Sequence, residues 1–382
     1  MNVVLHLSFW LLSLLGIYSY FIYPVLLRLL PSRDVSPVGE ADLPIPSMSV
    51  IVTARNEQAR IREKIQNLLS LSAYPGEIEI IIASDASDDD TDRIVTEFAE
   101  QGVVLVRSPV NDGKEAAQAL AIAAAKGELL VFSDVATSMQ GDVLARIAKH
   151  FADPNVGALS STDRFLDRDG RPAGEGAYVR YEMWLRGQES RVSSLIGLSG
   201  SFFAARAEIC RKNWATTIPS DFMTAINCIR EGSVAISADD VFGYYTDLAD
   251  PRKEYRRKVR TVVRGMRALA ETREMLSFSK YGLFAFQIWS HKIMRWVAPW
   301  CLLLVLLINL ALLDTHPIYK LTLGVQVFFY GLATLGALVP KSRDLFAVRI
   351  PYYFVAANLA VMHAALDFFR GKAVVTWTPS ER

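Results

Sequence analysis

Short apolar runs alternate with helical patterns through the first half of the chain's middle region. Each run is continuous and rich in β-branched residues, which is typical of buried strands. We expect these strands at 48–53, 78–84, 103–107 and 128–133. The spacing of apolar residues between them predicts helices at 57–71, 91–100 and 114–126. Strands that alternate with helices of this length indicate βαβ units and a parallel sheet.

The alternation becomes less regular after residue 134. The pattern there predicts strands at 156–162, 197–205 and 233–237, and helices at 176–191 and 221–230. We therefore expect an α/β domain whose sheet is mostly parallel with helices on both faces. Its first half has the order typical of nucleotide binding, and its second half is arranged differently.

Apolar residues are concentrated at the two ends of the chain. The segment from Val3 to Leu27 carries no charged side chain and is long enough to span a bilayer, which takes about 20 residues. Its far end is bulky and lacks a small-residue cleavage site, so a transmembrane helix is favoured over a cleaved signal peptide. Three more apolar stretches follow near the C-terminus, at 297–313, 321–339 and 351–369.

The distribution of charge predicts the sidedness of the membrane protein. Most Lys and Arg lie between the apolar ends, which places the middle region in the cytoplasm, at the inner cell membrane. Four crossings would return the tail to the N-terminal side, whereas the basic tail argues that one stretch lies in the interface. The expected division is a transmembrane helix (1–30), a linker (31–46), a cytoplasmic domain (47–275), interfacial and transmembrane helices (281–369) and a cytoplasmic tail (370–382).

Overall composition excludes several classes of protein. The formal net charge is +1 and the hydrophobic content is 51%, so charge favours neither nucleic-acid binding nor disorder. The three cysteines form no CxxC pair and the five histidines are scattered. A zinc site or a disulfide framework is therefore not expected.

Three aspartates stand at element ends where chemistry is expected. Asp85 follows the run 78–84, Asp134 follows the run 129–133, and Asp221 follows Pro219-Ser220 at the start of a helical stretch. The carboxyl ends of parallel strands form the rim where open α/β sheets bind ligands. Such carboxylates suit a metal ion, a nucleotide diphosphate and a proton that must be removed.

Each aspartate also has a purely structural interpretation. Asp85 opens the loop SDASDDDTD, in which Asp88 or Asp90 is expected to cap the next helix. Asp85 itself, directly at the strand end, is the better candidate to accept hydrogen bonds from a base or ribose. Asp134 is a candidate ligand for Mg²⁺ or Mn²⁺, and Asp221 is either an N-cap or a general base.

Two basic features of the sequence can balance the negative charge of a bound diphosphate. Lys114 follows a glycine at a helix start, where phosphate binding is natural, although a surface lysine fits almost as well. The segment 252–273 carries an apolar stripe beside an arginine stripe that includes Arg257 and Arg260. It can rest on anionic lipid, and its guanidinium groups can also neutralise a leaving diphosphate.

The ordered set of motifs carries a family resemblance. TARNE, SDAS, NDGK, FSD, GSGSFFAAR, PSDF and RKVRT follow one another before the membrane segments. The chain resembles a membrane-bound, inverting family 2 glycosyltransferase of the GT-A type, near the exopolysaccharide, cellulose and hyaluronan synthases. The resemblance covers about 48–267 and implies a nucleotide-diphosphate sugar as donor, with a UDP-sugar favoured, and Mg²⁺ or Mn²⁺ as cofactor.

The resemblance also implies roles for individual residues. Lys114 would approach the donor phosphates, Asp134 would hold the metal, and Asp221 would deprotonate the acceptor hydroxyl. Gly200 and Ser201 would border the acceptor. Arg257 and Arg260 would match the QxxRW element, and Trp377 to Arg382 resembles a segment that covers the nucleotide. The nucleotide pocket would be lined by Thr53, Ala54, Arg55, Glu57 and Asp85.

Two departures from the family pattern bear on the activity. Ala136 stands where the metal motif usually ends in a carboxylate or polar residue, and Thr261 stands where QxxRW has its Trp. The missing Trp favours transfer of one or a few sugars to a lipid-linked acceptor over processive synthesis of a polysaccharide. The expected function is thus sugar transfer to a lipid-linked or polysaccharide acceptor at the inner membrane, in exopolysaccharide or cell-envelope glycan synthesis. The alternative is a catalytically silent relative that binds nucleotide or partners.

Overall fold

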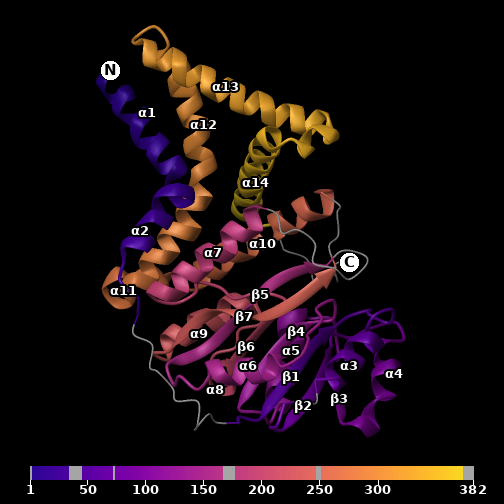
Figure 1. Cartoon of the computed structure of the whole chain (residues 1–382). Coiled ribbons are helices and arrows are strands. Elements are labelled where there is room, and N and C mark those ends of the chain that lie inside the picture. The colour runs from indigo at the N-terminus through magenta and orange to yellow at the C-terminus, as the bar shows by residue number, and fades with distance from the viewer. Residues whose placement is uncertain (1, 34–44, 72–73, 167–176, 247–250, 373–382) are drawn as a thin grey trace. The chain divides into compact units, whose positions relative to one another are not determined.

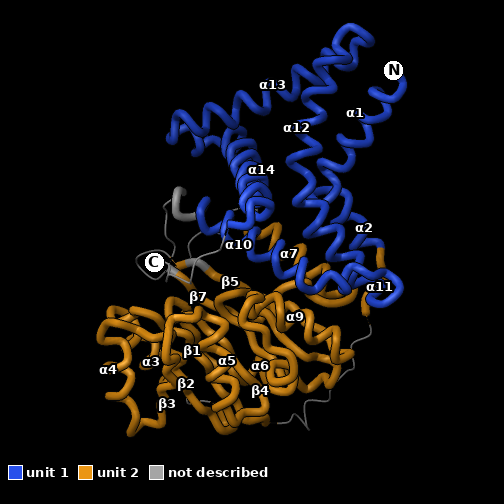
Figure 2. Tube along the Cα trace, turned by 180° about the vertical axis from the view of Figure 1, so that it is seen from behind, with its two compact units in different colours: residues 1–29, 250–374 blue, residues 30–249, 375–382 orange. Residues whose placement is uncertain are grey.

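The computed structural model describes residues 2–33, 45–71, 74–166, 177–246 and 251–372 (Figure 1). The chain divides into two compact units, which Figure 2 colours separately. A helical unit is built from residues 1–29 and 250–374, and an α/β unit is built around residues 30–249. Each unit is described by itself.

A seven-stranded sheet forms the centre of the α/β unit, in the order β3-β2-β1-β4-β6-β5-β7. The pairs β1–β2, β2–β3, β1–β4 and β5–β7 are parallel, and β6 runs antiparallel to both β4 and β5. The fold class expected from the sequence, a mostly parallel sheet covered by helices, is therefore confirmed. The strands are β1 (Met48–Ala54), β2 (Ile78–Ser84), β3 (Val103–Arg107), β4 (Leu129–Asp134), β5 (Val156–Leu166), β6 (Phe202–Arg206) and β7 (Val234–Thr246).

Helices pack on both faces of this sheet because alternate strand residues are apolar on each face. The helices of the unit are α3 (Ile61–Leu69), α4 (Thr91–Thr96), α5 (Lys114–Ala124), α6 (Val143–His150), α7 (Ala177–Val192), α8 (Ala207–Lys212) and α9 (Ser220–Arg230). One core contains residues of α3, α4 and α6 together with Val50, Val52 and Val131. The opposite core contains residues of α5, α8 and α9 together with Ile51, Ile81 and Phe132.

The structure corrects several element boundaries. The helix expected at 57–71 begins only at Ile61, because the amide of Glu57 donates to the Thr91 hydroxyl (2.7 Å) and the chain first makes a turn. The helix expected at 91–100 ends as α4 at Thr96, and a short 3-10 turn (Ala99–Gln101) follows. The sequence patterns missed α6 and α8, which are short.

The largest errors lie in the second half of the sheet. The strand expected at 233–237 runs to Thr246 as β7, since it pairs with β5 across a register shift near Ser160 and Thr162. The strand expected at 197–205 is only β6 (Phe202–Arg206), because residues 197–201 form a loop. Apolar content alone does not reveal the pairing of β7 with β5 or of β6 with β4 and β5, because each pairing depends on residues far apart in the chain.

Among the described residues, the helical unit contains four segments that are long and apolar enough to cross a membrane, at Val3–Leu29, Phe278–Leu312, Pro317–Leu338 and Phe346–Phe369. Its remaining major helix is α10 (Pro251–Glu271), which packs against α14. The elements of the four segments are α1 (Asn2–Ile17), the π-helical turn η1 (Tyr18–Ile22), α2 (Tyr23–Leu29), α11 (Phe278–Gln287), the π-helical turn η5 (Ile288–Ile293), α12 (Met294–Leu312), α13 (Pro317–Leu338) and α14 (Phe346–Phe369).

Specific contacts join these helices. Phe9 of α1 packs with Val305 and Leu312 of α12, and His6 Nδ1 lies 2.6 Å from the Tyr319 hydroxyl of α13. The N-terminal segment is therefore part of a helical bundle. Since α10 also packs within this unit, the expected domain end at 275 does not coincide with the boundary between the compact units.

Candidate active site

Three polar side chains share one face of the sheet at the ends of adjacent strands. The alternation of side chains places Thr53, Asp85 and Asp134 on the same face as Ile51 and Phe132, residues of the core formed with α5. They belong to β1, the turn after β2, and β4, which are neighbours in the sheet. Parallel pairing thus places the expected donor-binding residues at one edge, facing the start of α5.

A chain of contacts joins Asp134 to the loop before β6. Lys114, the first residue of α5, places its Nζ 2.6 Å from Asp134 Oδ1 and donates to the Gly200 carbonyl at 2.8 Å. A methyl group at Gly200 would lie 3.6 Å from Asp221 Oδ2. The expected phosphate-binding lysine, metal ligand, acceptor-bordering glycine and general base are therefore gathered in one place.

The loop 199–201 is held by a network of hydroxyl groups and one carboxylate. Asp163 Oδ1 of β5 accepts hydrogen bonds from the hydroxyls of Ser199 (3.0 Å) and Tyr245 (3.1 Å). The Ser201 hydroxyl donates to the Tyr245 oxygen at 2.9 Å. Burial raises the pKa of the Tyr245 phenol, so this hydroxyl stays protonated and can keep donating. Sequence patterns missed Asp163 and Tyr245, because nothing local links β5 and β7 to this loop.

Asp221 lies in the first turn of α9, whose N-cap residue is Pro219. Its backbone carbonyl accepts from the amide of Leu198 (3.2 Å), which fixes the helix start beside the loop 197–201. The N-cap interpretation of Asp221 is wrong, since the residue lies within the helix. Its carboxylate faces Gly200 instead.

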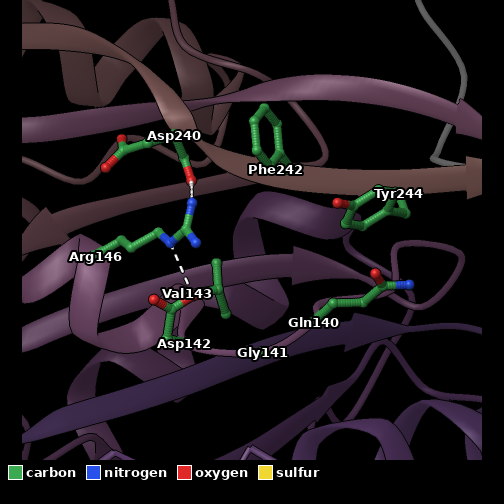
Figure 3. Close-up of a pocket in the computed structure, with 8 residues that line it drawn as sticks. All are labelled: Gln140, Gly141, Asp142, Val143, Arg146, Asp240, Phe242 and Tyr244. Atoms are coloured by element: carbon green, nitrogen blue, oxygen red, sulfur yellow. Dashed lines mark hydrogen bonds and ion pairs between the residues drawn. The ribbon is translucent and has the colours of Figure 1, made fainter.

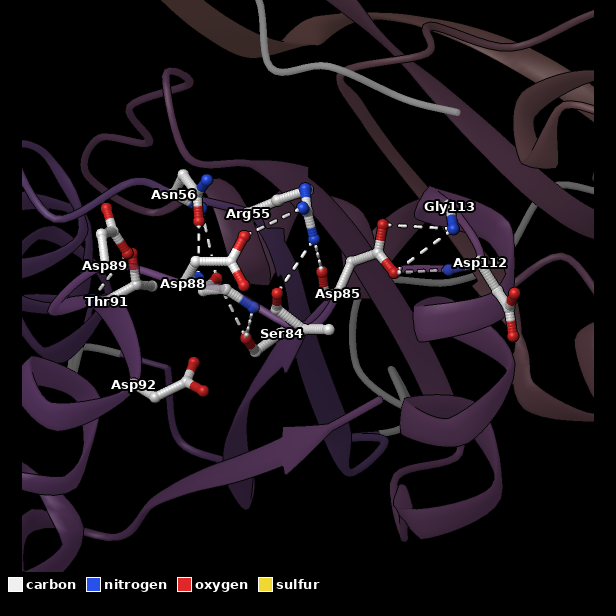
Figure 4. Close-up of polar contacts among 12 residues, drawn as sticks. Arg55, Asn56, Ser84, Asp85, Asp88, Asp89, Thr91, Asp92, Asp112 and Gly113 are labelled. Atoms are coloured by element: carbon white, nitrogen blue, oxygen red, sulfur yellow. Dashed lines mark hydrogen bonds and ion pairs between the residues drawn. The ribbon is translucent and has the colours of Figure 1, made fainter. Parts of the chain in front are cut away.

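Asp85 is buried and binds the backbone at the start of α5. Its oxygens accept from the amides of Asp112 (3.1 Å) and Gly113 (3.1 and 3.2 Å), as Figure 4 shows. Burial raises the pKa of this carboxyl, and the two amides act in the opposite direction. Asp85 thus positions the turn that presents Lys114. Its expected contact with a base or ribose stays a prediction.

The remaining aspartates of the acidic loop bind neighbouring protein groups (Figure 4). Arg55 donates to the carbonyls of Asp85 (2.5 Å) and Ala86 (2.9 Å), and it pairs with Asp88 at 3.2 Å. Asp89 Oδ1 accepts from both the amide (3.0 Å) and the hydroxyl of Thr91. Capping at the start of α4 is therefore done by Asp89, whereas the cap expected from Asp88 or Asp90 is not formed.

Three other residues of the predicted nucleotide pocket are buried. Thr53 is 2% exposed, and its hydroxyl has no hydrogen-bond partner within the described part of the chain. Glu57 pairs with Arg60 (2.9 Å), and burial raises the pKa of its carboxyl. Ala54, the last residue of β1, is fully buried.

Four expected site residues do not belong to the described part of the α/β unit. Arg257 and Arg260 belong to α10 in the helical unit, where burial and the neighbouring arginines 264 and 257 lower the pKa of Arg260. Their expected role at the diphosphate stays a prediction. Trp377 and Arg382 lie outside the described residues.

The residues around Asp134 fit a metal ion that takes most of its ligands from elsewhere. The Asp134 side chain is 28% exposed, so one carboxylate is open to solvent beside Lys114. Within the described ranges there is no group of three or more His, Cys, Asp or Glu side chains that could hold a metal. Mg²⁺ and Mn²⁺ sites on nucleotides commonly use one or two carboxylates with phosphate oxygens and water. Asp134 alone can serve such a site.

A separate pocket lies where α6 begins beside β7 (Figure 3). Its volume is about 320 Å³, and its walls include Gln140, Phe242 and Tyr244. Arg146 crosses it, since it bonds Asp142 Oδ1 (2.8 Å) and the Asp240 carbonyl (3.0 Å). None of the residues expected to bind substrate lines this pocket.

A protein-family model identifies the α/β unit. Residues 49–214 match the model described as Glycosyl transferase family 2. The chain contains a family 2 glycosyltransferase domain. This match includes Asp85, Lys114 and Asp134 and ends just before Asp221.

Curated relatives agree with this assignment. The chain is 33% identical over 127 residues to a β-monoglucosyldiacylglycerol synthase of Synechocystis sp., which covers 32% of this chain and 26% of that protein. It is 27% identical over 161 residues to an N-acetylglucosaminyltransferase of Rhizobium meliloti, covering 39% and 35% respectively. The chain thus spans well under half of these relatives' length.

The structural comparison covers nearly the whole chain. A mannosyltransferase of Pyrobaculum calidifontis, solved with GDP-Man and Mn²⁺, matches with a TM-score of 0.74 over 97% of this chain and all of that chain. The identity is 22%, so this likeness concerns the GT-A fold alone.

Proposed function

We propose that the protein transfers a sugar, with inversion, from a nucleotide-diphosphate sugar to a lipid-linked or growing polysaccharide acceptor at the inner membrane. The observation that carries this proposal is that Lys114 contacts both Asp134 and the Gly200 carbonyl, while a methyl group at Gly200 would lie 3.6 Å from Asp221 Oδ2. This arrangement places a carboxylate and an ammonium suited to a diphosphate beside a carboxylate suited to a hydroxyl. The four candidate membrane segments support an acceptor that is held by lipid.

The proposed reaction uses the protein's own groups in sequence. Asp221 accepts the proton of the acceptor hydroxyl, whose oxygen attacks the anomeric carbon as the bond to the diphosphate breaks. Lys114 exchanges its contact with Asp134 for the departing phosphate oxygens and stabilises their charge. A divalent metal ion, when bound by Asp134 and the diphosphate, supplies further neutralisation of that charge. Arg257 and Arg260 of α10 are proposed to add to it.

The donor pocket is proposed to lie over the ends of β1 and β2. Thr53, the strand partner of Asp134, is proposed to line this pocket. A UDP-sugar is the favoured donor, although the relatives do not decide the nucleotide. The absence of the QxxRW tryptophan at Thr261 favours transfer of few sugars over a processive polymerase.

Release of nucleoside diphosphate tests the proposal against the catalytically silent alternative. The purified full chain in detergent is incubated with a panel of UDP- and GDP-sugars, with and without EDTA. We expect release with at least one donor, and loss of that release when EDTA removes the metal. Absence of release with every donor, both alone and in the presence of membrane lipid extract, favours the silent relative.

A further inference from the structure

A buried lysine lies behind the turn that carries Asp134. Lys64 of α3 is 3% exposed, and its Nζ donates to the Ser133 hydroxyl (2.8 Å) and to the Thr137 carbonyl (2.5 Å). The side chain of Ser133 points to the opposite face of the sheet from Asp134, toward α3. Lys64 therefore reaches the turn from the side away from the substrate groups.

These two hydrogen bonds hold the residue before the turn 134–137, Ser133, and the last residue of the turn, Thr137. Asp134 accepts from the amide of Thr137 through its own carbonyl (3.2 Å), which closes the turn 134–137. On the other side, Asp134 donates its amide to the Ser201 carbonyl (2.9 Å), and the Thr137 hydroxyl donates to the same carbonyl (3.3 Å). The Asp134 backbone is thus held between the loop 199–201 and Lys64.

Packing does not require a lysine at this position. Ile61, Ile65 and Leu68 lie on the same buried face of α3, at the spacing at which an apolar residue is expected at position 64. Burial of an amine is unfavourable, and it lowers the pKa of Lys64 to about 7 while the nearby Asp134 charge acts in the opposite direction. An apolar side chain would avoid this cost but could not bond Ser133 and Thr137.

We propose that Lys64 is a positioning residue that holds the Asp134 turn in the orientation needed to bind the metal and the donor diphosphate. This inference rests on the proposed function. Lys64 touches neither substrate nor metal in this scheme, and it acts through Asp134. Groups behind a metal ligand typically change metal affinity by about 10- to 100-fold when they are removed.

The test compares Lys64→Met with Ile65→Val. The first variant keeps a long side chain but loses both donor bonds, and the second removes one buried methylene from the same helix face. Mn²⁺ binding to each full-length protein in detergent is followed by electron paramagnetic resonance, with UDP and with GDP. We expect Lys64→Met to weaken Mn²⁺ binding about tenfold or more, whereas Ile65→Val changes it less than about twofold.

A double variant shows whether Lys64 acts through Asp134. In an Asp134→Asn background, Lys64→Met is expected to cause no further loss of Mn²⁺ binding. An equal loss in both backgrounds overturns the proposal, as does unchanged Mn²⁺ binding by Lys64→Met itself. If Lys64→Met does not fold, Ser133→Ala, which removes one acceptor, replaces it and should weaken Mn²⁺ binding several-fold.

The Mn²⁺-binding test of Lys64 and the nucleoside-diphosphate test of the proposed function can fail independently. If the wild-type protein binds Mn²⁺ with nucleotide but releases no nucleoside diphosphate, the transfer reaction is contradicted. The effect of Lys64→Met on Mn²⁺ binding can still be measured in that case. A wild-type protein that releases nucleoside diphosphate, while Lys64→Met keeps wild-type Mn²⁺ binding, contradicts only the role of Lys64.

Discussion

The two halves of the candidate site are built in different ways. The proposed donor half lies at the ends of adjacent parallel strands: Thr53 is near the end of β1, Asp85 follows β2, and Asp134 is the last residue of β4. The proposed acceptor half consists of the loop around Gly200 and Ser201, which Asp163 and Tyr245 hold, and of the helix start at Asp221. Local sequence suffices to position the first half, whereas the second depends on contacts from β5 and β7.

This difference suggests that substitutions in the two halves separate donor binding from transfer. Groups of the donor half should control binding of nucleotide and metal. Groups of the acceptor half should control the chemical step or the position of the acceptor. Substitutions in each half test that separation.

The largest effect is expected for Asp221→Asn. The amide cannot take the proton of the acceptor hydroxyl, and a general base contributes roughly 10²- to 10⁴-fold to the rate. We expect kcat for sugar transfer to fall by about that factor, while nucleotide affinity, measured by calorimetry, stays near the wild-type value. Turnover that persists in this variant would show that Asp221 is not the base.

Asp134→Asn should act on the donor side. Loss of the charge removes the partner of Lys114 and the proposed metal ligand, so we expect kcat/KM for the donor to fall by roughly 10²- to 10³-fold. In contrast to Asp221→Asn, nucleotide binding should also lose its response to Mn²⁺. A variant that binds nucleotide as the wild type does, with and without Mn²⁺, contradicts the donor assignment.

Tyr245→Phe tests the network behind the acceptor loop. The change leaves Asp163 and Ser201 each without one buried partner, which costs about 1–3 kcal/mol of stability. We expect the acceptor KM to rise several-fold and the donor KM to change little. Gly187→Ala, at a position of α7 where a methyl group meets open space, serves as the control. A rise in donor KM equal to that in acceptor KM would remove the distinction between the two halves.

The smallest expected effect is a change in the free energy of unfolding with pH. Because burial lowers the Lys64 pKa from 10.5 to about 7, the unfolded chain binds more protons between these pH values. Stability relative to Lys64→Met should therefore rise with pH over this window, by up to about 1.4 kcal/mol per pH unit, and be constant below it. Thermal unfolding of both proteins in detergent from pH 6 to 9.5 measures the difference. A difference in midpoint that stays flat across this range contradicts burial of a titrating lysine.

Much of the donor half was accessible from sequence because its signals are local. A β-branched run fixes each strand, and the residue that follows the run falls at the sheet edge wherever the neighbouring strands are parallel. Asp85, Asp134 and the helix that begins at Lys114 were located in this way. The apolar segments at both ends were equally readable, since the length and composition of a single segment decide whether it can cross a bilayer.

Other features were decided by tertiary structure alone. The full length of β7, the loop before β6 and the network of Asp163 and Tyr245 arise from pairing between segments about 80 residues apart, which leaves no periodic trace in either one. Lys64 left one weak signal, a lysine on an apolar helical face, but only packing shows that its amine reaches Ser133 and Thr137. Sequence determined where β2 and β4 end, because each is marked by a local run of apolar residues. The tertiary structure decided which distant side chains hold the site residues, because contacts between distant segments leave no periodic pattern in the sequence.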